Sequence, residues 1–413
     1  MSATAVLNAK ECLDPMAAIA GPEHARIAGE SVVVAPADAQ QVAEILRFAN
    51  ANRIAVTPMG SGSKIGWGNP VAAGIRLEMK RMNSLREHPW QDMTCTVEVG
   101  CTWSAMQAEL ARHGQVVALD PLWPERATVG GVVSTNDGGA SRLKYGGLRD
   151  LIIGMTIVLA DGTIAKTGGK VVKNVAGYDL HKLMTGGFGT LGVVTEVNFR
   201  LHPIEAHTRT WTAVAKDATV FGAPLMAILD SQITPSAAQI RMDRGECAFD
   251  VRIAAVPECM ELQEEKLRKI FGKIELKVSN DAVWEARQDL FAREGAAVLK
   301  VTLLSSDVCP VSAELEQWAA KNEMEISVVA QANGLMTVAL KSSPDAVITL
   351  IGHLRKRLKN SGGSVVALKI PETGLGGLDV WGCDSNALPL MREIKRRFDP
   401  NRILNPGKFV GNI

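Results

Sequence analysis

Three glycine-dense segments in the first half of the chain constrain its fold more than any other feature. They read VTPMGSGSKIGWGNP at 56–70, DPLWPERATVGGVVSTNDGG at 120–139 and MTGGFGTLG at 184–192. Glycine lets the backbone approach a ligand where a Cβ would clash, and successive backbone N–H groups form a concave site for an anion. One extended ligand with a central diphosphate would explain all three segments together.

No single segment matches a familiar phosphate-binding fingerprint. The first is not a P-loop, because Ser63 stands immediately before Lys64, where a P-loop has its second glycine. It also fails the dinucleotide pattern G-x-G-x-x-G, because Ile65 occupies the place of the third glycine after Gly60 and Gly62. The first segment taken alone is therefore better explained as an ordinary tight loop, and it is the presence of three such segments that favours a ligand.

The residues between the glycine segments predict an α/β framework. Strands are expected at 31–36 and 53–58, and the helix between them begins after Asp38, a good N-cap. Further strands are expected at 94–100 and 193–201, with a hairpin at 155–168. The stretch 120–152 lacks strong periodicity, so we expect a long functional loop there.

The second half has a different organisation. From 208 to 278 the pattern is strand, helix, strand, strand, helix, strand, and the same order recurs from 298 to 370. A helix is expected between the two repeats, around Trp284–Phe291. Two such units predict a ferredoxin-like, mainly antiparallel sheet with helices on one face.

Composition excludes several classes of protein. The 413 residues carry a net charge of +1, which gives no electrostatic reason to expect nucleic acid or an anionic membrane surface as a partner. No apolar run reaches the ~18 residues of a membrane span. The N-terminus carries charged residues where a signal peptide needs an apolar stretch, which predicts a cytoplasmic protein.

Cysteine and histidine give no sign of a metal. The seven cysteines include no C-x-x-C pair, so neither an iron–sulfur cluster nor structural zinc is expected in this chain. The seven histidines include no pair at metal-ligand spacing. We therefore assign no metal site, and the catalytic residues stay unassigned.

Four segments in order resemble the FAD-binding family of vanillyl-alcohol oxidase, whose flavin domain is called PCMH-type. They are PMGSGSKIGWG, DPLWPERATVGGVVSTNDGG, GYDLHKLMTGGFGTLGVVTEV and IKRRFDPNRILNPGKFV. Within the family, KVVKNVAGYDLHKLMTG and GLDVWG are most similar to the FAD-binding E-type subunits of bacterial glycolate oxidase. The resemblance implies an α+β protein with a PCMH-type FAD-binding domain at 1–203, a ferredoxin-like cap at 204–375 and a C-terminal segment, 376–413, that returns to the FAD domain.

The resemblance also implies which residues hold FAD. The residues that would line the diphosphate are Pro58, Met59, Gly60, Ser61, Gly62 and Ser63. Those that would follow the cofactor to the ring edge are Pro121, Thr128, Gly130, Gly131, Ser134, Thr135, Asn136 and Gly138. The adenosine end would be held by Gly189 and Val194. Some relatives tether FAD through a histidine in the first loop, where this chain has Ser63 or Lys64, so non-covalent FAD is expected. Phe188 stands where relatives often have glutamate, and any polar contact made there is lost.

The implied function is that of an FAD-binding subunit in a multi-subunit enzyme that oxidises glycolate to glyoxylate. A second FAD-binding subunit would carry the substrate site, and an iron–sulfur subunit would take the electrons. The complex would be cytoplasmic, either free or attached through these partners to the inner face of the membrane. Two alternatives stay open: a self-sufficient FAD-dependent oxidoreductase on another hydroxy acid or alcohol, and a structural flavoprotein subunit. Lys170, Lys173 and Asn174 either lie near the flavin ring or form a solvated loop. Arg241, Arg252 or Arg287 could hold a carboxylate, but arginine is a poor base.

Overall fold

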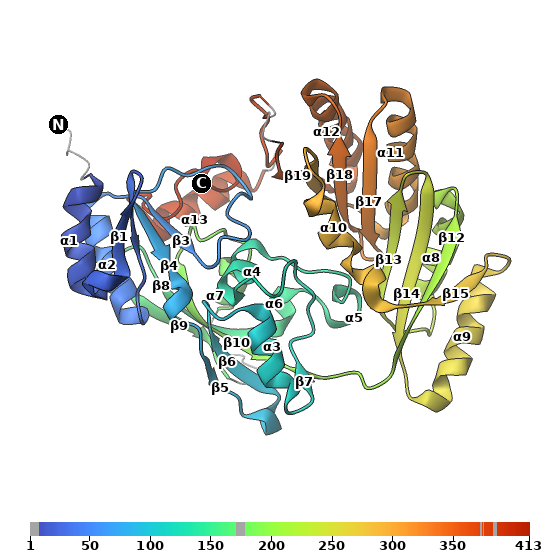
Figure 1. Cartoon of the computed structure of the whole chain (residues 1–413), viewed down its shortest axis with the longest axis horizontal. Coiled ribbons are helices and arrows are strands. Elements are labelled where there is room, and N and C mark those ends of the chain that lie inside the picture. Colours follow the sequence, from blue (N-terminus) through green and yellow to red (C-terminus); the bar gives the residue numbers. More distant parts are fainter. Residues whose placement is uncertain (1–7, 171–177, 372–373, 375, 383–385) are drawn as a thin grey trace. The chain divides into compact units, whose positions relative to one another are not determined.

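The computed structural model describes residues 8–170, 178–371, 374, 376–382 and 386–413. Within these residues the chain divides into two compact units (Figure 1). Unit 1 comprises Met1–Gly138, Gly147–Ile204 and Asp384–Ile413, and unit 2 comprises Gly139–Gly146 and Glu205–Cys383. The short segment Gly139–Gly146 therefore belongs to unit 2, although the residues on both sides of it in the sequence belong to unit 1.

Unit 1 begins with a small α/β layer. Its described residues form a four-stranded sheet in the order β1-β2-β4-β3, in which β2, β4 and β3 are parallel. Asp38 caps α2 by accepting a hydrogen bond from the Gln41 N–H at 2.9 Å, as the sequence predicts. The elements of this layer are α1 (Ala9–Ala20), β1 (Ala25–Ala28), β2 (Ser31–Val34), α2 (Ala39–Asn52), β3 (Val56–Met59) and β4 (Ile75–Glu78).

An antiparallel sheet forms the second layer of unit 1. Its order among the described residues is β5-β6-β10-β8-β9, and β8 and β9 are the predicted hairpin. Alternate residues of β10 are buried, as the pattern at 193–201 predicts. The strands are β5 (Leu85–Glu87), β6 (Thr94–Glu98), β8 (Ile152–Val158), β9 (Ile164–Gly168) and β10 (Val193–Arg200), while β7 (Gln115–Val116) pairs with β11 (His202–Pro203).

The expectation of a long loop at 120–152 is wrong. This stretch contains three short helices, α4 (Val129–Thr135), α5 (Arg142–Tyr145) and α6 (Leu148–Leu151). Helices of seven and four residues are too short to show a helical repeat in the sequence. The other helices of unit 1 are α3 (Trp103–Ala111), α7 (Leu180–Met184) and α13 (Leu388–Phe398).

The C-terminal segment adds to the edge of the first sheet. The Val56 N–H donates to the Ile403 carbonyl at 2.7 Å, and the Asn405 N–H donates to the Val56 carbonyl at 3.0 Å. Behind this pairing, the buried Lys395 ammonium contacts Asp399 and the Thr190 carbonyl, each at 2.7 Å. The end of the chain is therefore fixed both to β3 and to the third glycine segment; Figure 1 shows the red α13 near the blue strands.

Unit 2 contains the ferredoxin-like sheet, which confirms that part of the predicted fold. Its described residues form eight antiparallel strands in the order β15-β12-β14-β13-β17-β18-β16-β19. Each half contains four strands, and from the outer edge of the sheet inward these are the fourth, first, third and second strand of that half in sequence order. The second strands of the two halves, β13 and β17, pair at the centre of the sheet. The strands are β12 (Thr208–Ala215), β13 (Pro235–Asp243), β14 (Glu246–Ala254), β15 (Leu276–Ser279), β16 (Ala297–Thr302), β17 (Glu325–Gln331), β18 (Leu335–Lys341) and β19 (Ser364–Lys369). The helices are α8 (Gly222–Asp230), α9 (Pro257–Phe271), α10 (Ala286–Ala292), α11 (Val308–Asn322) and α12 (Pro344–Leu358).

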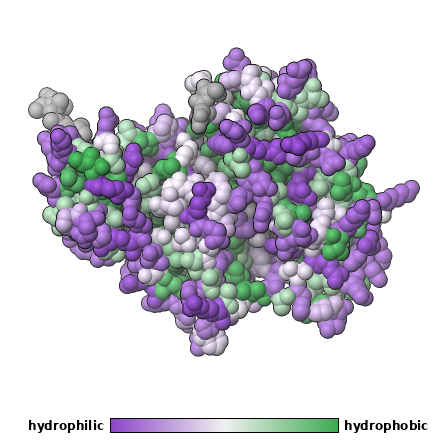
Figure 2. All heavy atoms as spheres, viewed as in Figure 1, coloured by the Kyte–Doolittle hydropathy of each residue, from purple (hydrophilic) through white to green (hydrophobic). Residues whose placement is uncertain are grey.

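No helix in the described part of the chain combines the length and apolar character that a membrane-spanning helix needs. Figure 2 shows that hydrophilic residues cover most of the visible face, with hydrophobic residues in small separate groups.

Candidate functional site

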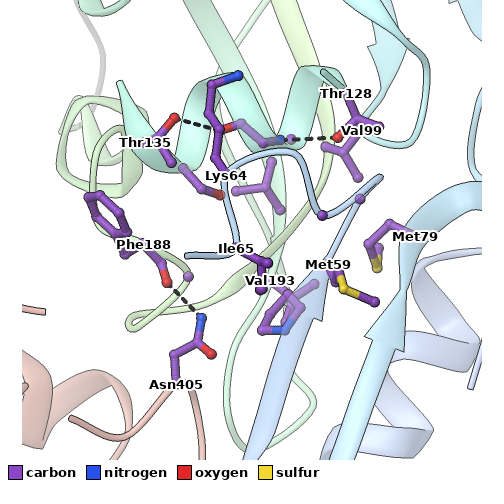
Figure 3. A pocket seen from close by; sticks show the side chains of 18 of the residues that line it. Met59, Lys64, Ile65, Met79, Val99, Thr128, Thr135, Phe188, Val193 and Asn405 are labelled. Carbon is purple, nitrogen blue, oxygen red and sulfur yellow. Dashed lines mark hydrogen bonds between the residues drawn. The ribbon is translucent and has the colours of Figure 1, made fainter. Parts of the chain in front are cut away.

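A cavity lies in unit 1 where the three glycine segments and the C-terminal segment meet (Figure 3). The described residues that line it are Pro58, Met59, Gly60, Ser61, Gly62, Ser63, Lys64, Ile65, Met79, Val99, Thr128, Gly130, Gly131, Ser134, Thr135, Phe188, Gly189, Gly192, Val193, Val194, Asn405 and Lys408. Segments more than 300 residues apart in the sequence thus form one site.

Most of the predicted cofactor residues lie on this wall. Pro58 to Ser63, Thr128, Gly130, Gly131, Ser134, Thr135, Gly189 and Val194 line the cavity, whereas Pro121, Asn136 and Gly138 are not among its lining residues. Asn136 has φ +48 and ends α4, a backbone role that asparagine fills well. Binding by all of these residues stays a prediction.

The first loop is pressed against the start of α4. A Cβ on Gly60 would stand 2.0 Å from the Thr128 hydroxyl oxygen, so only glycine fits there. Thr128 is the N-cap of α4 and accepts a hydrogen bond from the Gly131 N–H at 3.2 Å. Gly130 packs α4 on the strand behind it, because a Cβ there would lie 2.9 Å from the Val99 Cβ. The backbone of the first loop at Gly60 therefore packs directly on the Thr128 side chain, and a residue larger than glycine would not fit at position 60.

The third glycine segment is held by the C-terminal segment. The Asn405 side-chain amide donates to the Phe188 carbonyl at 2.7 Å, as the dashed line in Figure 3 shows. Gly189 follows with φ +67, and a Cβ there would lie 3.1 Å from the Asn405 amide nitrogen. Phe188 stacks on Phe409 with ring centroids 5.5 Å apart. Phe188 thus packs on the end of the chain.

Asn405 leaves one polar atom of the cavity wall unsatisfied. Its side chain is buried, and its carbonyl oxygen Oδ1 has no hydrogen-bond partner within the described residues. A buried acceptor without a donor costs about 1–3 kcal/mol. A ligand N–H or O–H at this position would remove that cost.

The charge of the cavity wall is positive. The Lys408 ammonium donates to the Ile65 carbonyl at 2.7 Å, and burial lowers the pKa of Lys408. Lys64 is held by the buried Asp137 carboxylate at 3.5 Å and lies over the Trp67 and Trp123 rings at 5.8 and 5.5 Å. None of the described lining residues is an aspartate or glutamate. An anion in the cavity would therefore meet backbone N–H groups, hydroxyls and the Lys408 ammonium, and no lining carboxylate.

These features fit a cofactor with a diphosphate. The glycine loops allow close backbone approach, Lys408 supplies a cation, and Asn405 supplies an acceptor at the Gly189 side of the cavity. Sequence reasoning assigned no role to Asn405 or Lys408, although both lie in the quoted motif NPGK. Contacts over 343 residues, such as that between Lys408 and Ile65, leave no local signal in a sequence.

Other candidate residues lie elsewhere. Lys170 pairs with Glu87 at 2.6 Å, and Lys173 and Asn174 lie outside the described residues. Within the described part of the chain, no three His, Cys, Asp or Glu residues are grouped so that they could hold a metal. Arg287 is buried in α10.

Two protein-family models match the chain: "FAD binding domain" over residues 31–168 and "FAD linked oxidases, C-terminal domain" over residues 383–409. Both matched ranges include residues of the cavity wall.

Curated relatives match over nearly the whole length. "Glycolate oxidase subunit GlcD" of Bacillus subtilis is 27% identical over 420 residues, which cover 91% of this chain and 88% of that protein. "D-lactate dehydrogenase" of Archaeoglobus fulgidus is 29% identical and covers 94% of this chain and 93% of its own.

Solved structures share the fold. p-Cresol methylhydroxylase with bound substrate superposes with a TM-score of 0.78 at 15% identity, covering 97% of this chain and 96% of its own. 4-Ethylphenol oxidase from Gulosibacter chungangensis gives 0.74 at 15% identity, with the same coverage. The predicted PCMH-type fold is confirmed.

Proposed function

We propose that this chain, which belongs to the FAD-linked oxidases, is the FAD-binding subunit of a complex that oxidises glycolate or a closely related 2-hydroxy acid to the 2-oxo acid. The observation that carries the proposal is the cavity in unit 1, where three glycine segments and a lysine-bearing C-terminal segment meet. FAD, when bound, supplies the two-electron acceptor that oxidation of a C–OH group needs.

The chain's own residues bind and orient the cofactor. Gly60 to Ser63 offer backbone N–H groups and hydroxyls to the diphosphate, and Lys408 offsets part of its charge. The unpaired Asn405 oxygen accepts a hydrogen bond from the adenosine end, beside Gly189.

We infer that FAD is bound without a covalent bond. Known tethers use a nucleophilic side chain, and the described residues of the cavity wall include no histidine, cysteine or tyrosine. Lys64, which with Ser63 is one of the two residues at the place of a tethering histidine, is held by Asp137 at 3.5 Å and by the Leu122 carbonyl at 3.2 Å. A buried ammonium held in this way is a poor nucleophile.

The complex that we propose contains a second FAD-binding subunit with the substrate site and an iron–sulfur subunit. The similarity to a protein named as a glycolate oxidase subunit supports an assembly of several chains. The described cysteines of this chain are unsuited to cluster ligation, because they are dispersed and because burial raises the pKa of Cys95 and of Cys309 to about 12. Electrons would then leave through a partner.

A second candidate is a self-sufficient oxidoreductase acting on D-lactate or a similar acid. It is favoured by the relative named D-lactate dehydrogenase, which matches over more than nine-tenths of both chains. The third possibility, a structural subunit that binds FAD without using it, has no observation of its own in support.

Anaerobic titration of the purified chain with glycolate, and with D-lactate, tests these functions. We expect the chain to contain FAD whose absorbance is bleached slowly or not at all by glycolate alone and rapidly when co-purified partners are present. Rapid bleaching by D-lactate without partners would favour the self-sufficient enzyme. A chain that neither contains FAD nor takes it up on reconstitution would overturn the proposal.

A further inference from the structure

The sheet of unit 2 has a second face whose polar residues the proposed cofactor site does not use. Phe249 of β14 packs on Phe221 and on Phe271 of α9, which marks one face as apolar core. Because side chains alternate along a strand, Asp250 and Arg252 project from the opposite face. The short 3₁₀ helix η5 (Asp281–Glu285) and the segment around Ser141 contact this second face.

Arg241, on the neighbouring strand, is fully neutralised on this face. It donates to the two oxygens of Asp250 through Nε at 2.6 Å and Nη2 at 2.9 Å, a bidentate pair. Asp250 is completely buried and also accepts hydrogen bonds from Thr212 and Gln239. Removing Arg241 from this pair would leave a buried charge, so it is not available to a ligand.

Arg252 has no such acid. Its Nε donates to the Ser236 hydroxyl at 3.2 Å, its Nη2 to the Ser141 hydroxyl at 3.4 Å, and the guanidinium lies 5.2 Å from the centre of the Trp284 ring. In the described part of the chain, no carboxylate lies within 4.0 Å of it. A guanidinium has five N–H donors, so the edge that includes Nη1 is free to donate.

The guanidinium is held in place by its neutral partners. Ser236 is completely buried, and Trp284 is fixed by a hydrogen bond from its indole N–H to the Thr210 hydroxyl at 3.2 Å. Thr210 in turn donates to Asp281 at 2.9 Å. A planar fork fixed in this way loses little freedom when it binds a carboxylate.

Glu205, an acid whose charge interacts with that of Arg252, is already paired. Glu205 accepts hydrogen bonds from Lys144 and Tyr145, each at 2.5 Å. Burial tends to raise the pKa of Glu205, but these two hydrogen bonds and the charges of Lys144 and Arg252 lower it overall, so it stays ionised. Glu205 is thus the hydrogen-bonded counter-ion of the Lys144 ammonium, and its charge acts on Arg252 only from beyond ion-pair distance, so the guanidinium N–H groups keep no described carboxylate partner.

We propose that Arg252 is a carboxylate-binding residue and that the second face of unit 2 binds the carboxylate of a 2-hydroxy acid there. The class of acid rests on the proposed function, whereas the carboxylate preference rests on the unpaired, preorganised guanidinium. Arginine stays protonated and cannot take the hydroxyl proton, so the residue serves binding and not proton transfer. This site for the acid would be additional to the substrate site that we propose for the partner subunit, so the chain would hold the acid even where oxidation requires that partner.

Equilibrium binding of oxalate to the FAD-loaded chain, measured by calorimetry, tests this inference. Oxalate has the two-carbon skeleton of glycolate and no C–H bond to oxidise, and glycolamide serves as the uncharged control ligand. We expect binding of oxalate and none of glycolamide. Arg252→Met should weaken oxalate binding by at least about tenfold, the loss typical of a charge-assisted hydrogen-bonded pair.

Arg209→Met is the matched control. Arg209 lies on the adjacent strand β12 and also over a tryptophan ring, Trp211 at 5.8 Å, but it is paired with Glu264 at 3.4 Å. Its loss should change oxalate affinity by less than about twofold, since an exposed pair contributes little. If Arg252→Met does not fold, Arg252→Lys decides the question, because it keeps the charge and loses the fork.

Three results would overturn the inference: a wild-type chain that does not bind oxalate, an Arg252→Met chain that binds it as well as wild type, or an Arg252→Lys chain with unchanged affinity. The proposed function fails by a different measurement. Should no 2-hydroxy acid reduce the flavin even with partners present, while Arg252 still controls oxalate binding, the proposed function would be wrong and this site would stand.

Discussion

Replacing Gly60 by alanine should abolish most FAD binding through a single steric contact. The new Cβ would lie 2.0 Å from the Thr128 hydroxyl oxygen, 2.9 Å from its methyl carbon and 3.0 Å from its Cβ. Rotating Thr128 cannot relieve all three contacts, so the loop and α4 must separate by about 1 Å or more in a closely packed region. Any rotation of the Thr128 side chain that reduces the overlap also breaks its capping bond with the Gly131 N–H.

The magnitude follows from these two losses. Overpacking costs about 1–3 kcal/mol and loss of an N-cap about 1 kcal/mol. If the chain avoids the strain by moving the loop, the loss of about 2–4 kcal/mol appears in cofactor affinity, which is a factor of roughly thirty to a thousand. Titration of the flavin-free chain with FAD, followed by fluorescence quenching, measures this directly.

Two further variants separate the contact from other effects. Gly62 has φ +78, and within the chain a Cβ there would meet only the Met59 sulfur at 3.7 Å. Any loss of FAD affinity in Gly62→Ala beyond the roughly 1 kcal/mol of backbone strain therefore measures contact of the new Cβ with the cofactor and not a contact between the loop and α4. Thr128→Gly removes the atoms that a Cβ at position 60 would strike and costs a few tenths of a kcal/mol as a cap. The double variant Gly60→Ala/Thr128→Gly should therefore bind FAD better than Gly60→Ala alone. Wild-type affinity in Gly60→Ala, or no recovery in the double variant, would refute this reasoning.

Three other predictions concern the cofactor bond, the chain end and pH. Acid precipitation should release intact FAD into the supernatant, and flavin that stays with the pellet would contradict non-covalent binding. Asp399→Asn should destabilise the chain by about 3–5 kcal/mol in urea unfolding and lower its FAD content, because it leaves the Lys395 ammonium buried without its carboxylate. Glu205 has a folded-state pKa below its ordinary 4.5, so its stabilising contribution is complete above that pH and is lost as the pH falls through the lowered pKa. Glu205→Gln should flatten this acid limb in urea unfolding, and an unchanged limb would show that other carboxylates cause it.

The parts of the fold that sequence reasoning found are those with a local signal. The Asp38 cap, the turn at Asp161-Gly162 and the alternation at 193–201 each act within a few residues, and each forms as predicted. The doubled strand and helix order of the second half was enough to predict the ferredoxin-like sheet, because that order allows few unknotted topologies. Short helices such as α5 and α6 have no periodicity to detect and were missed.

The site was predictable only in part, for the same reason. The glycine segments can be recognised because glycine itself marks close backbone approach, but their meeting in one cavity depends on tertiary packing. Which of the three arginines is available to a ligand also could not be known. Arg241 is opposite Ala248 in the strand register. Asp250 follows Ala248 by two residues and precedes Arg252 by two, so its carboxylate could pair with either arginine, and in the structure it pairs with Arg241.

The C-terminal segment shows how such long-range contacts link folding to function. Lys395 and Asp399 are buried, and the Asp399 carboxylate also accepts the N–H groups of Ile403 and Leu404. This network fixes the turn that places Asn405 against Phe188 and Lys408 against Ile65, on two walls of the same cavity. A ligand that contacts Asn405 and Lys408 binds only the state in which this segment is docked, so its binding free energy adds to the stability of the docked segment. Cofactor affinity and the order of the last residues are therefore one equilibrium, although the glycine loops lie more than 300 residues away in the sequence.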